Sequence, residues 1–248
     1  MRFLVTNDDG IYAPGIKALA QTLNAFGEVI IIAPDQERSG VGHGITVHHP
    51  LRVEKVELFP EVRECYMVDG TPADCVKIAI QGLDIQPDMV VSGINLGANL
   101  GTDVLYSGTV SAAIEGVLLG VPSLAISVCK NISYLPTATY FLTRLLFELK
   151  TPLPKDGLLN VNVPALRQDE VKGILATKLG VRLYKNEFVK RLDPQGKAYY
   201  WMKGVPYAPA SESDHDHVAI EQGYVSVTPI QFDLTYHALF SELRDSLQ

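Results

Sequence analysis

Apolar runs and helix-spaced apolar positions alternate over the first 130 residues of the chain. Short runs of β-branched and other apolar side chains predict buried strands at residues 3–6, 28–33, 88–92 and 123–127. Apolar positions three or four residues apart predict helices at residues 16–26, 72–81 and 110–119. Because strands that alternate with helices of this length form βαβ units, we expect an α/β fold with a Rossmann-like, doubly wound, mostly parallel sheet.

The pattern changes after about residue 150. A further buried strand is expected at residues 158–163, a late strand at 224–229 and a terminal helix at 236–247. Between them, residues 171–205 are rich in Tyr, Val and Lys, which favours β-hairpins over βαβ units.

These patterns predict one domain over residues 1–248, with a Rossmann-like core at residues 1–150. Residues 151–248 would complete the sheet and add a β-hairpin arm and a C-terminal helix. Aromatic residues are spread along the predicted arm, which is typical of an oligomerisation element; they are Tyr184, Tyr199, Tyr200 and Trp201.

Composition and charge narrow the class of protein. The 248 residues carry a net charge of −7 and give a pI of about 5.4, which argues against a nucleic-acid polymer as partner. Cys65, Cys75 and Cys129 are odd in number and lack CxxC spacing, so neither a disulfide framework nor a zinc site is predicted. The sequence shows no signal peptide and no apolar run of membrane-spanning length, so we expect a cytoplasmic protein without a membrane partner.

The first predicted strand ends at two adjacent carboxylates, Asp8 and Asp9, followed by Gly10. Ligands bind at the carboxyl ends of the strands in an open parallel sheet. Two neighbouring carboxylates at that place repel each other and lose solvation unless a cation lies between them. Oxygen ligands suit a hard divalent cation such as Mg²⁺. The alternative is an Asx-type turn that caps the next helix, since the segment also has good turn chemistry.

Two further loops at predicted strand ends are rich in small polar residues. Residues 34–44 carry Ser39 among glycines, and residues 92–102 carry Asn95. Together with the two carboxylates, their side chains would supply about four oxygens to an octahedral ion and leave about two positions for water or substrate. Taken singly, Ser39 also fits a flexible loop and Asn95 fits a turn or a cap.

A third set of small residues, Ser107, Gly108 and Thr109, leads into the predicted helix at 110–119. The accessible N–H groups and the positive end of a helix form a phosphate-binding site, although ordinary N-capping explains the same residues. His43 lies in the glycine-rich loop close to Ser39 and could face the substrate, while a surface or hydrogen-bonded position is more usual for such a His.

Other phosphate and metal motifs are absent from the sequence. No GxxxxGK[ST] segment indicates a P-loop, and the glycines at 93, 97 and 101 do not form the GxGxxG fingerprint of dinucleotide binding. His215 and His217 flank Asp216 without the HExxH spacing of a zinc hydrolase.

The loops at the strand ends belong to a set of motifs spread over nearly the whole chain. In these motifs the chain resembles the SurE family, the survival protein E nucleotidases. Several motifs in a fixed order are more specific than any single one, and no motif position departs from the family pattern. The matching segments are residues 4–10, 13–15, 33–40, 70–75, 92–97 and 106–109 and, more weakly, 223–229.

The resemblance implies a metal-dependent phosphatase that acts on nucleoside 5′- and 3′-monophosphates and on short polyphosphate. It implies one divalent ion per subunit, Mg²⁺ or Mn²⁺, with Asp8, Asp9, Ser39 and Asn95 as ligands. It also implies a Rossmann-like core whose C-terminal arm helps to build homodimers, often paired into homotetramers.

The expected reaction is attack of water on phosphorus, with Asp8 or Asp9 as general base and with Asn95 and residues 107–109 holding the phosphate. A covalent aspartyl-phosphate route is an alternative, although the adjacent carboxylates differ from the DxD spacing of haloacid-dehalogenase phosphatases. Two further alternatives are a non-catalytic nucleotide- or metal-binding regulator and an NAD-dependent enzyme. The NAD-dependent enzyme would need a GxGxxG turn where residues 7–10 stand.

Overall fold

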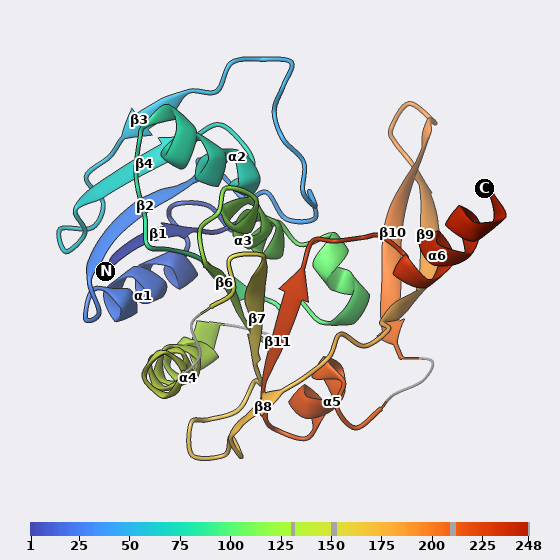
Figure 1. The fold of residues 1–248 in the computed structure, drawn as a ribbon. Coiled ribbons are helices and arrows are strands. Elements are labelled where there is room, and N and C mark those ends of the chain that lie inside the picture. The colour runs from blue at the N-terminus through green and yellow to red at the C-terminus, as the bar shows by residue number, and fades with distance from the viewer. Residues whose placement is uncertain (130–131, 150–152, 209–211, 248) are drawn as a thin grey trace.

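The computed structural model describes residues 1–129, 132–149, 153–208 and 212–247 (Figure 1). Within these residues, nine strands form one sheet with helices on both faces, and a two-stranded hairpin extends away from it. The strands of the sheet are β1 (Arg2–Thr6), β2 (Glu28–Pro34), β3 (Val53–Lys55), β4 (Glu64–Val68), β5 (Met89–Leu96), β6 (Ser123–Val128), β7 (Gly157–Val163), β8 (Ile174–Ala176) and β11 (Val225–Gln231).

The strands follow the order β3-β4-β2-β1-β5-β6-β7-β11-β8. All neighbours from β4 to β7 run parallel, whereas β3 and β11 run antiparallel to β4 and β7. The predicted α/β fold with a mostly parallel sheet is therefore confirmed. Strands from both halves of the chain join in this sheet, because β7, β11 and β8 extend it beyond β6.

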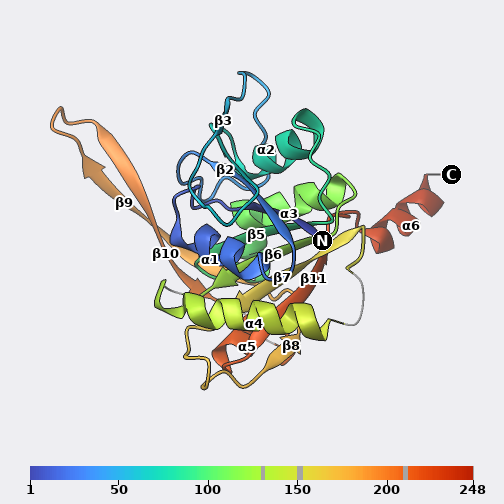
Figure 2. The same cartoon turned by 90° about the vertical axis from the view of Figure 1, so that its left-hand side faces the viewer.

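Helices cover both faces of the sheet (Figure 2). Helices α1 (Pro14–Leu23) and α4 (Leu135–Glu148) pack into one apolar cluster, and α2 (Pro72–Lys77) and α3 (Gly108–Leu118) pack on the other face. The remaining helices are α5 (Asp216–Glu221), α6 (His237–Ser246) and the short η1 (Ile78–Gly82), η2 (Gly101–Leu105) and η3 (Ile132–Tyr134).

Two predicted helices are shorter in the structure than expected. The helix expected at 16–26 ends at Leu23, because the N–H groups of Phe26 and Gly27 both turn back to the Leu23 carbonyl. The helix expected at 72–81 ends at Lys77 and continues as η1, where the Leu83 N–H reaches the Ile78 carbonyl in a wider π-type turn.

The expectation of hairpins over residues 171–205 is only partly correct. Its first segment, β8, joins the main sheet parallel to β11, and a single long hairpin follows, made of β9 (Leu183–Leu192) and β10 (Ala198–Tyr207). Strands β3 and β4 were not expected, because both are short and carry charged or polar positions among their apolar ones.

The hairpin and α6 extend from the core in different directions (Figure 2). Both expose apolar side chains, and no described residue of α6 is buried. Among the exposed side chains are Phe188, Tyr200, Trp201, Met202, Leu239, Phe240 and Leu243. No helix within the described ranges combines the length and apolar character needed to cross a membrane.

Candidate active site at the strand ends

The two carboxylates that follow β1 lie at the carboxyl edge of the sheet. Asp8 is buried, and its Oδ1 accepts a 2.5 Å hydrogen bond from the Thr109 hydroxyl at the start of α3. The Asp8 carbonyl accepts the Arg38 N–H at 2.7 Å, which brings the loop after β2 to the end of β1. Asp9 is half-buried, and its Oδ2 accepts the Leu96 N–H at 3.4 Å. Three strand ends therefore meet at this pair.

The electrostatics of the pair favour a bound cation. Burial raises the pKa of Asp8, against hydrogen bonds from Thr109 that lower it. Burial and then the negative charge of Asp8 raise the pKa of Asp9 to about 6. Two ionised carboxylates at this place thus destabilise each other, and a positive ion between them removes that cost.

Helix α3 begins in direct contact with Asp8. A Cβ atom built on Gly108 would lie 2.8 Å from the Asp8 Cβ, so only glycine allows this close approach. Ser107 caps the helix by accepting the Val110 N–H at 3.1 Å. The capping alternative for Ser107 is therefore present in the structure, and the Thr109 hydroxyl binds a carboxylate rather than facing the cavity.

A bulge in β5 determines where Asn95 lies. Three steps along β5 from Ser92 to Asn95 match two steps along β6, from Ala125 to Ser127, and the bulge contains Gly93 at φ 136°. The Asn95 amide donates to the Gly97 carbonyl at 2.8 Å. Because the Asn95 Nδ2 already donates to this carbonyl, its Oδ1 is the side-chain atom left to bind a metal ion or a substrate.

A cavity of about 690 Å³ connects these residues. Five of the predicted site residues line it: Asp8, Asp9, Ser39, Asn95 and Ser107. Their proposed roles as ligands stay predictions, but they come from four separate segments and share one cavity. Ser39 is exposed, and its hydroxyl donates to the Glu37 carboxylate at 2.8 Å.

His43 does not line this cavity. Its ring nitrogen Nε2 lies 2.9 Å from the buried carboxylate of Glu115 in α3. This is the hydrogen-bonded position that the sequence left open as the alternative to a place beside the substrate.

The sequence did not reveal the outer wall of the cavity. Asp103 lies in η2, and its Oδ2 accepts from Arg182 Nη1 at 2.7 Å and from the Tyr184 hydroxyl at 2.8 Å. This anchors the first residues of the hairpin to the loop after β5. The wall residues that the sequence analysis missed are Glu37, Gly40, Leu96, Ala98, Asn99, Asp103, Tyr106, Tyr184, Met202 and Gly204.

A buried amide network holds the loop that carries these wall residues. The Asn99 N–H donates to Asn162 Oδ1 at 2.8 Å, and the Asn99 carbonyl accepts from the side chains of Asn160 and Asn162. The Asn99 side chain donates to Ser127 at 2.9 Å. Polar residues at alternate positions of the otherwise apolar β7 were the sequence signal for this network.

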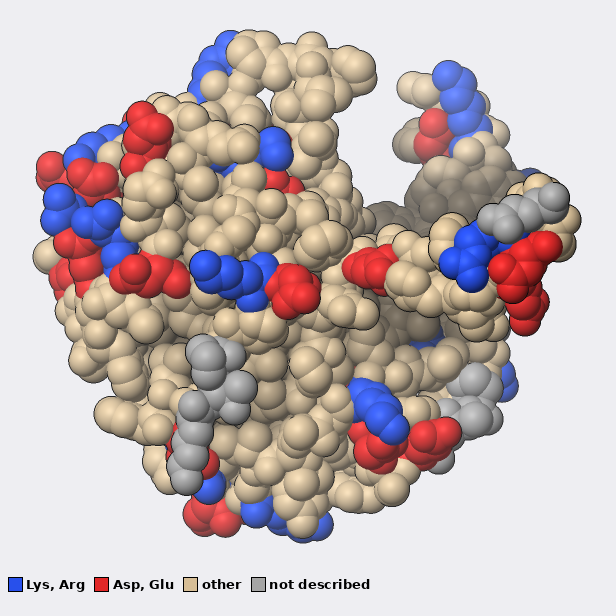
Figure 3. Space-filling model, viewed as in Figure 1, with Lys and Arg blue, Asp and Glu red and all other residues tan. Residues whose placement is uncertain are grey.

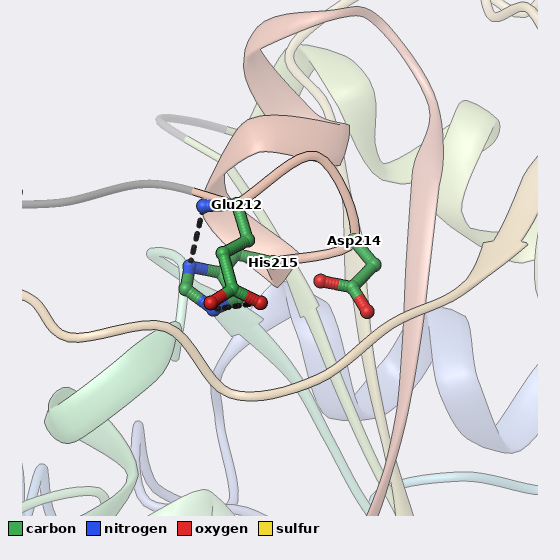
Figure 4. A group of neighbouring side chains, drawn as sticks. All are labelled: Glu212, Asp214 and His215. Carbon is green, nitrogen blue, oxygen red and sulfur yellow. Dashed lines mark hydrogen bonds and ion pairs between the residues drawn. The ribbon is translucent and has the colours of Figure 1, made fainter.

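A second group of potential metal ligands lies before α5 and outside the cavity. Glu212, Asp214 and His215 bring ligand atoms within 4.8 Å of one another (Figure 4). Asp214 forms an ion pair with Lys178 at 2.7 Å, and His215 accepts the Glu212 N–H at 3.2 Å. Because these exposed or half-buried groups have protein partners, the cluster needs no ion.

The comparisons with known proteins agree with this geometry. The model of the family described as survival protein SurE matches residues 3–186. The chain belongs to the SurE family. A relative from Alkaliphilus metalliredigens, named 5′-nucleotidase SurE, is 51% identical over 99% of this chain and 98% of its own length. A relative of the same name from Carboxydothermus hydrogenoformans is 50% identical over 98% of this chain and 95% of its own length.

A solved structure shows the same SurE fold. The crystal structure of the SurE protein from Aquifex aeolicus superposes with a TM-score of 0.82 at 41% identity and covers 100% of both chains. The resemblance stated from the sequence motifs is therefore confirmed, and the SurE fold extends over the hairpin arm as well as the core.

Proposed function

We propose that this SurE-family protein is a metal-dependent 5′-nucleotidase that releases phosphate from nucleoside 5′- and 3′-monophosphates and from short polyphosphate. The observation that carries the proposal is the meeting of Asp8, Asp9, Ser39, Asn95 and Ser107 in one cavity. The names of its full-length relatives support the substrate class.

The donor atoms of the cavity fit one hard divalent cation. Asp8, Asp9, Ser39 and Asn95 would hold it through oxygen atoms, which suits Mg²⁺ or Mn²⁺. The raised pKa values of the two carboxylates fit the same assignment, since no Lys, Arg or His of the described residues forms an ion pair with either carboxylate. When bound, such an ion neutralises charge on the transferred phosphoryl group and lowers the pKa of a coordinated water.

The chain's own residues would bind and orient the phosphate. The N–H groups at the start of α3, around Ser107 and Gly108, lie at the positive end of an eleven-residue helix and suit a phosphate oxygen. Asp8 or Asp9 accepts the proton of the attacking water as its oxygen bonds to phosphorus. The ester P–O bond then breaks, and the nucleoside oxygen leaves with its bonding electron pair and takes up a proton from that same carboxylic acid, which restores the carboxylate.

The cavity has room for more than a phosphate group. Its wall away from the carboxylates includes Tyr106, Tyr184 and Met202, whose exposed aromatic and thioether surfaces suit the flat face of a nucleobase. Lys and Arg side chains on the face shown in Figure 3 are interspersed with Asp and Glu rather than gathered into a basic track. A small nucleotide fits this site better than a nucleic-acid polymer.

The test is phosphate release from a panel of nucleoside 5′- and 3′-monophosphates, with EDTA and then with Mg²⁺ or Mn²⁺ restored. We expect EDTA to abolish release and either ion to restore it. Release that EDTA leaves unchanged would contradict the metal site and favour a covalent aspartyl-phosphate, which labelled phosphate on the protein would reveal. Folded protein without release on any substrate would favour a nucleotide-binding regulator.

We also propose that the hairpin and α6 are covered in a homodimer or homotetramer. Trp201 on the hairpin and Phe240 on α6 are 63% and 56% exposed, and large exposed apolar side chains on projecting elements usually mark an interface. Light scattering on the purified protein tests this proposal, and a monomer at micromolar concentration contradicts it.

A further inference from the structure

Glu115 is a buried carboxylate that the proposed reaction does not use. It lies in α3, about two turns after Gly108, and its side chain is 4% exposed. His43 Nε2 lies 2.9 Å from its Oε2, and Lys77 Nζ lies 2.8 Å from its Oε1. Burial raises the pKa of Glu115, but the hydrogen bonds from His43 and Lys77 outweigh burial and hold this pKa below that of a free Glu. Since an ionised carboxylate only accepts hydrogen bonds, His43 Nε2 is the donor.

The loop that carries His43 also carries the predicted ligand Ser39. It has no regular secondary structure between Ser39 and Thr46. Backbone atoms of its second half are held by two other segments: the Gly42 N–H donates to the Tyr106 carbonyl at 3.1 Å, and the Gly44 carbonyl accepts the Thr71 hydroxyl at 2.7 Å.

His43 makes the one side-chain hydrogen bond from residues 40–46, all of which the structure describes. Ser39 itself donates only to Glu37, a neighbour in the same loop. The place of Ser39 in the cavity therefore depends on the attachments of the loop on either side of it. Before Ser39, the Arg38 N–H donates to the Asp8 carbonyl. After Ser39, the loop is attached through the backbone of Gly42, Gly44 and Thr46, and His43 adds the attachment made by a side chain.

We propose that His43 is a positioning residue, which by holding Glu115 keeps Ser39 where its hydroxyl can share one cation with Asp8, Asp9 and Asn95. The inference rests on the metal site of the proposed function. Glu115 belongs to the same helix whose first turn contacts Asp8, so one carboxylate fixes the Ser39 loop relative to the other side of the site. His43 acts through the loop and does not touch the substrate.

The first test is titration of the intact protein with Mn²⁺ by calorimetry, which needs no turnover. We expect His43→Ala to weaken Mn²⁺ binding about tenfold, the usual lower range for residues that orient metal ligands. His43→Gln keeps an N–H donor at nearly the same reach and should recover most of the affinity. The matched control is His48→Ala, because His48 is exposed in the same loop and forms no hydrogen bond or ion pair within the described residues; it should change the affinity less than about twofold.

A second readout separates positioning from general stability. Hydrogen–deuterium exchange over residues 36–46 should be faster in metal-free His43→Ala, with the thermal midpoint nearly unchanged and with His48→Ala like wild type. If His43→Ala keeps the wild-type affinity for Mn²⁺, the role of His43 is wrong while the proposed metal site stands. The same holds if His48→Ala weakens Mn²⁺ binding as much as His43→Ala does. Wild-type protein that binds no Mn²⁺ overturns the proposed metal site and this inference with it.

Discussion

The strands around the cavity and the elements that project from the core differ in how far their apolar side chains are buried. Around the cavity, β1, β2, β5 and β6 bury their apolar side chains almost completely, and the buried Asp8 has its own hydrogen-bond partner. In the hairpin and in α6, Trp201 and Phe240 are more than half exposed. One chain therefore builds the proposed active-site cavity by itself, whereas the hairpin and α6 carry apolar surface that a single copy leaves uncovered.

The largest expected effect is the loss of one carboxylate from the cavity. Asp8→Asn keeps the shape of the side chain but removes the charge, so phosphate release should fall by about 10³-fold or more with the circular dichroism spectrum unchanged. The control is Asp156→Asn, an exposed Asp that is not part of the cavity lining, which should leave release unchanged. Near-normal turnover by Asp8→Asn would contradict the proposed site.

Two glycines of α3 allow the site and the core to be separated. A Cβ at Gly108 meets Asp8, whereas a Cβ at Gly116 would lie 2.3 Å from the Ser123 Oγ in the core. Gly108→Ala should lower phosphate release about 10²-fold by displacing Asp8, with little loss of stability. Gly116→Ala should instead cost about 1–3 kcal/mol in urea unfolding. The comparison fails if both variants lose activity and stability together.

A smaller effect is expected where the arm joins the cavity. Asp103→Asn weakens the hydrogen bonds from Arg182 and Tyr184, so the Michaelis constant for a nucleotide should rise about tenfold with a smaller change in turnover. Tyr184→Phe removes only the hydrogen bond from the Tyr184 hydroxyl and should raise the Michaelis constant less. Steady-state kinetics of both variants, on a nucleotide and on a small phosphate ester, measure the Michaelis constant and the turnover number. An equal change for the two substrates would show that this wall does not face the nucleoside.

The smallest effect on the reaction is expected from removal of α6. A chain ended after Thr235 loses no buried side chain of the described structure, so phosphate release per site should stay within about twofold. Its association state, measured by light scattering, should fall. Unchanged assembly would show that α6 is not part of the interface, and a chain that fails to fold would contradict the division between core and arm.

The sequence predicted those features that depend on local pattern. Asp8, Asp9 and Asn95 were predicted to lie together because each follows a short apolar run of the sequence, and parallel strands bring their carboxyl ends to one edge. All three line one cavity in the structure. The Tyr184 wall was missed, because it depends on a contact with Asp103 from a distant part of the chain. No local period predicts such a pair.

The limits of local pattern also explain the errors in the fold. The apolar residues of the segment at 72–81 fit a regular α-helix. The wider π-type turn that begins at Ile78 is not encoded in this spacing and depends on tertiary packing. From the sequence, β8 was predicted to be part of a hairpin, because a three-residue strand carries too little pattern to show which strand it pairs with.

The bulge in β5 makes the length of this strand as important as its composition. Successive strand residues point to opposite faces, so the extra residue between Ser92 and Asn95 decides which face Asn95 presents. Without the bulge, Asn95 would stand opposite Val128 instead of Ser127, and its side chain would point to the other face of the sheet. The segment can therefore exchange many of its side chains during evolution, provided that the irregular backbone between Ser92 and Asn95 is kept, because it sets the face on which Asn95, a proposed metal ligand, lies.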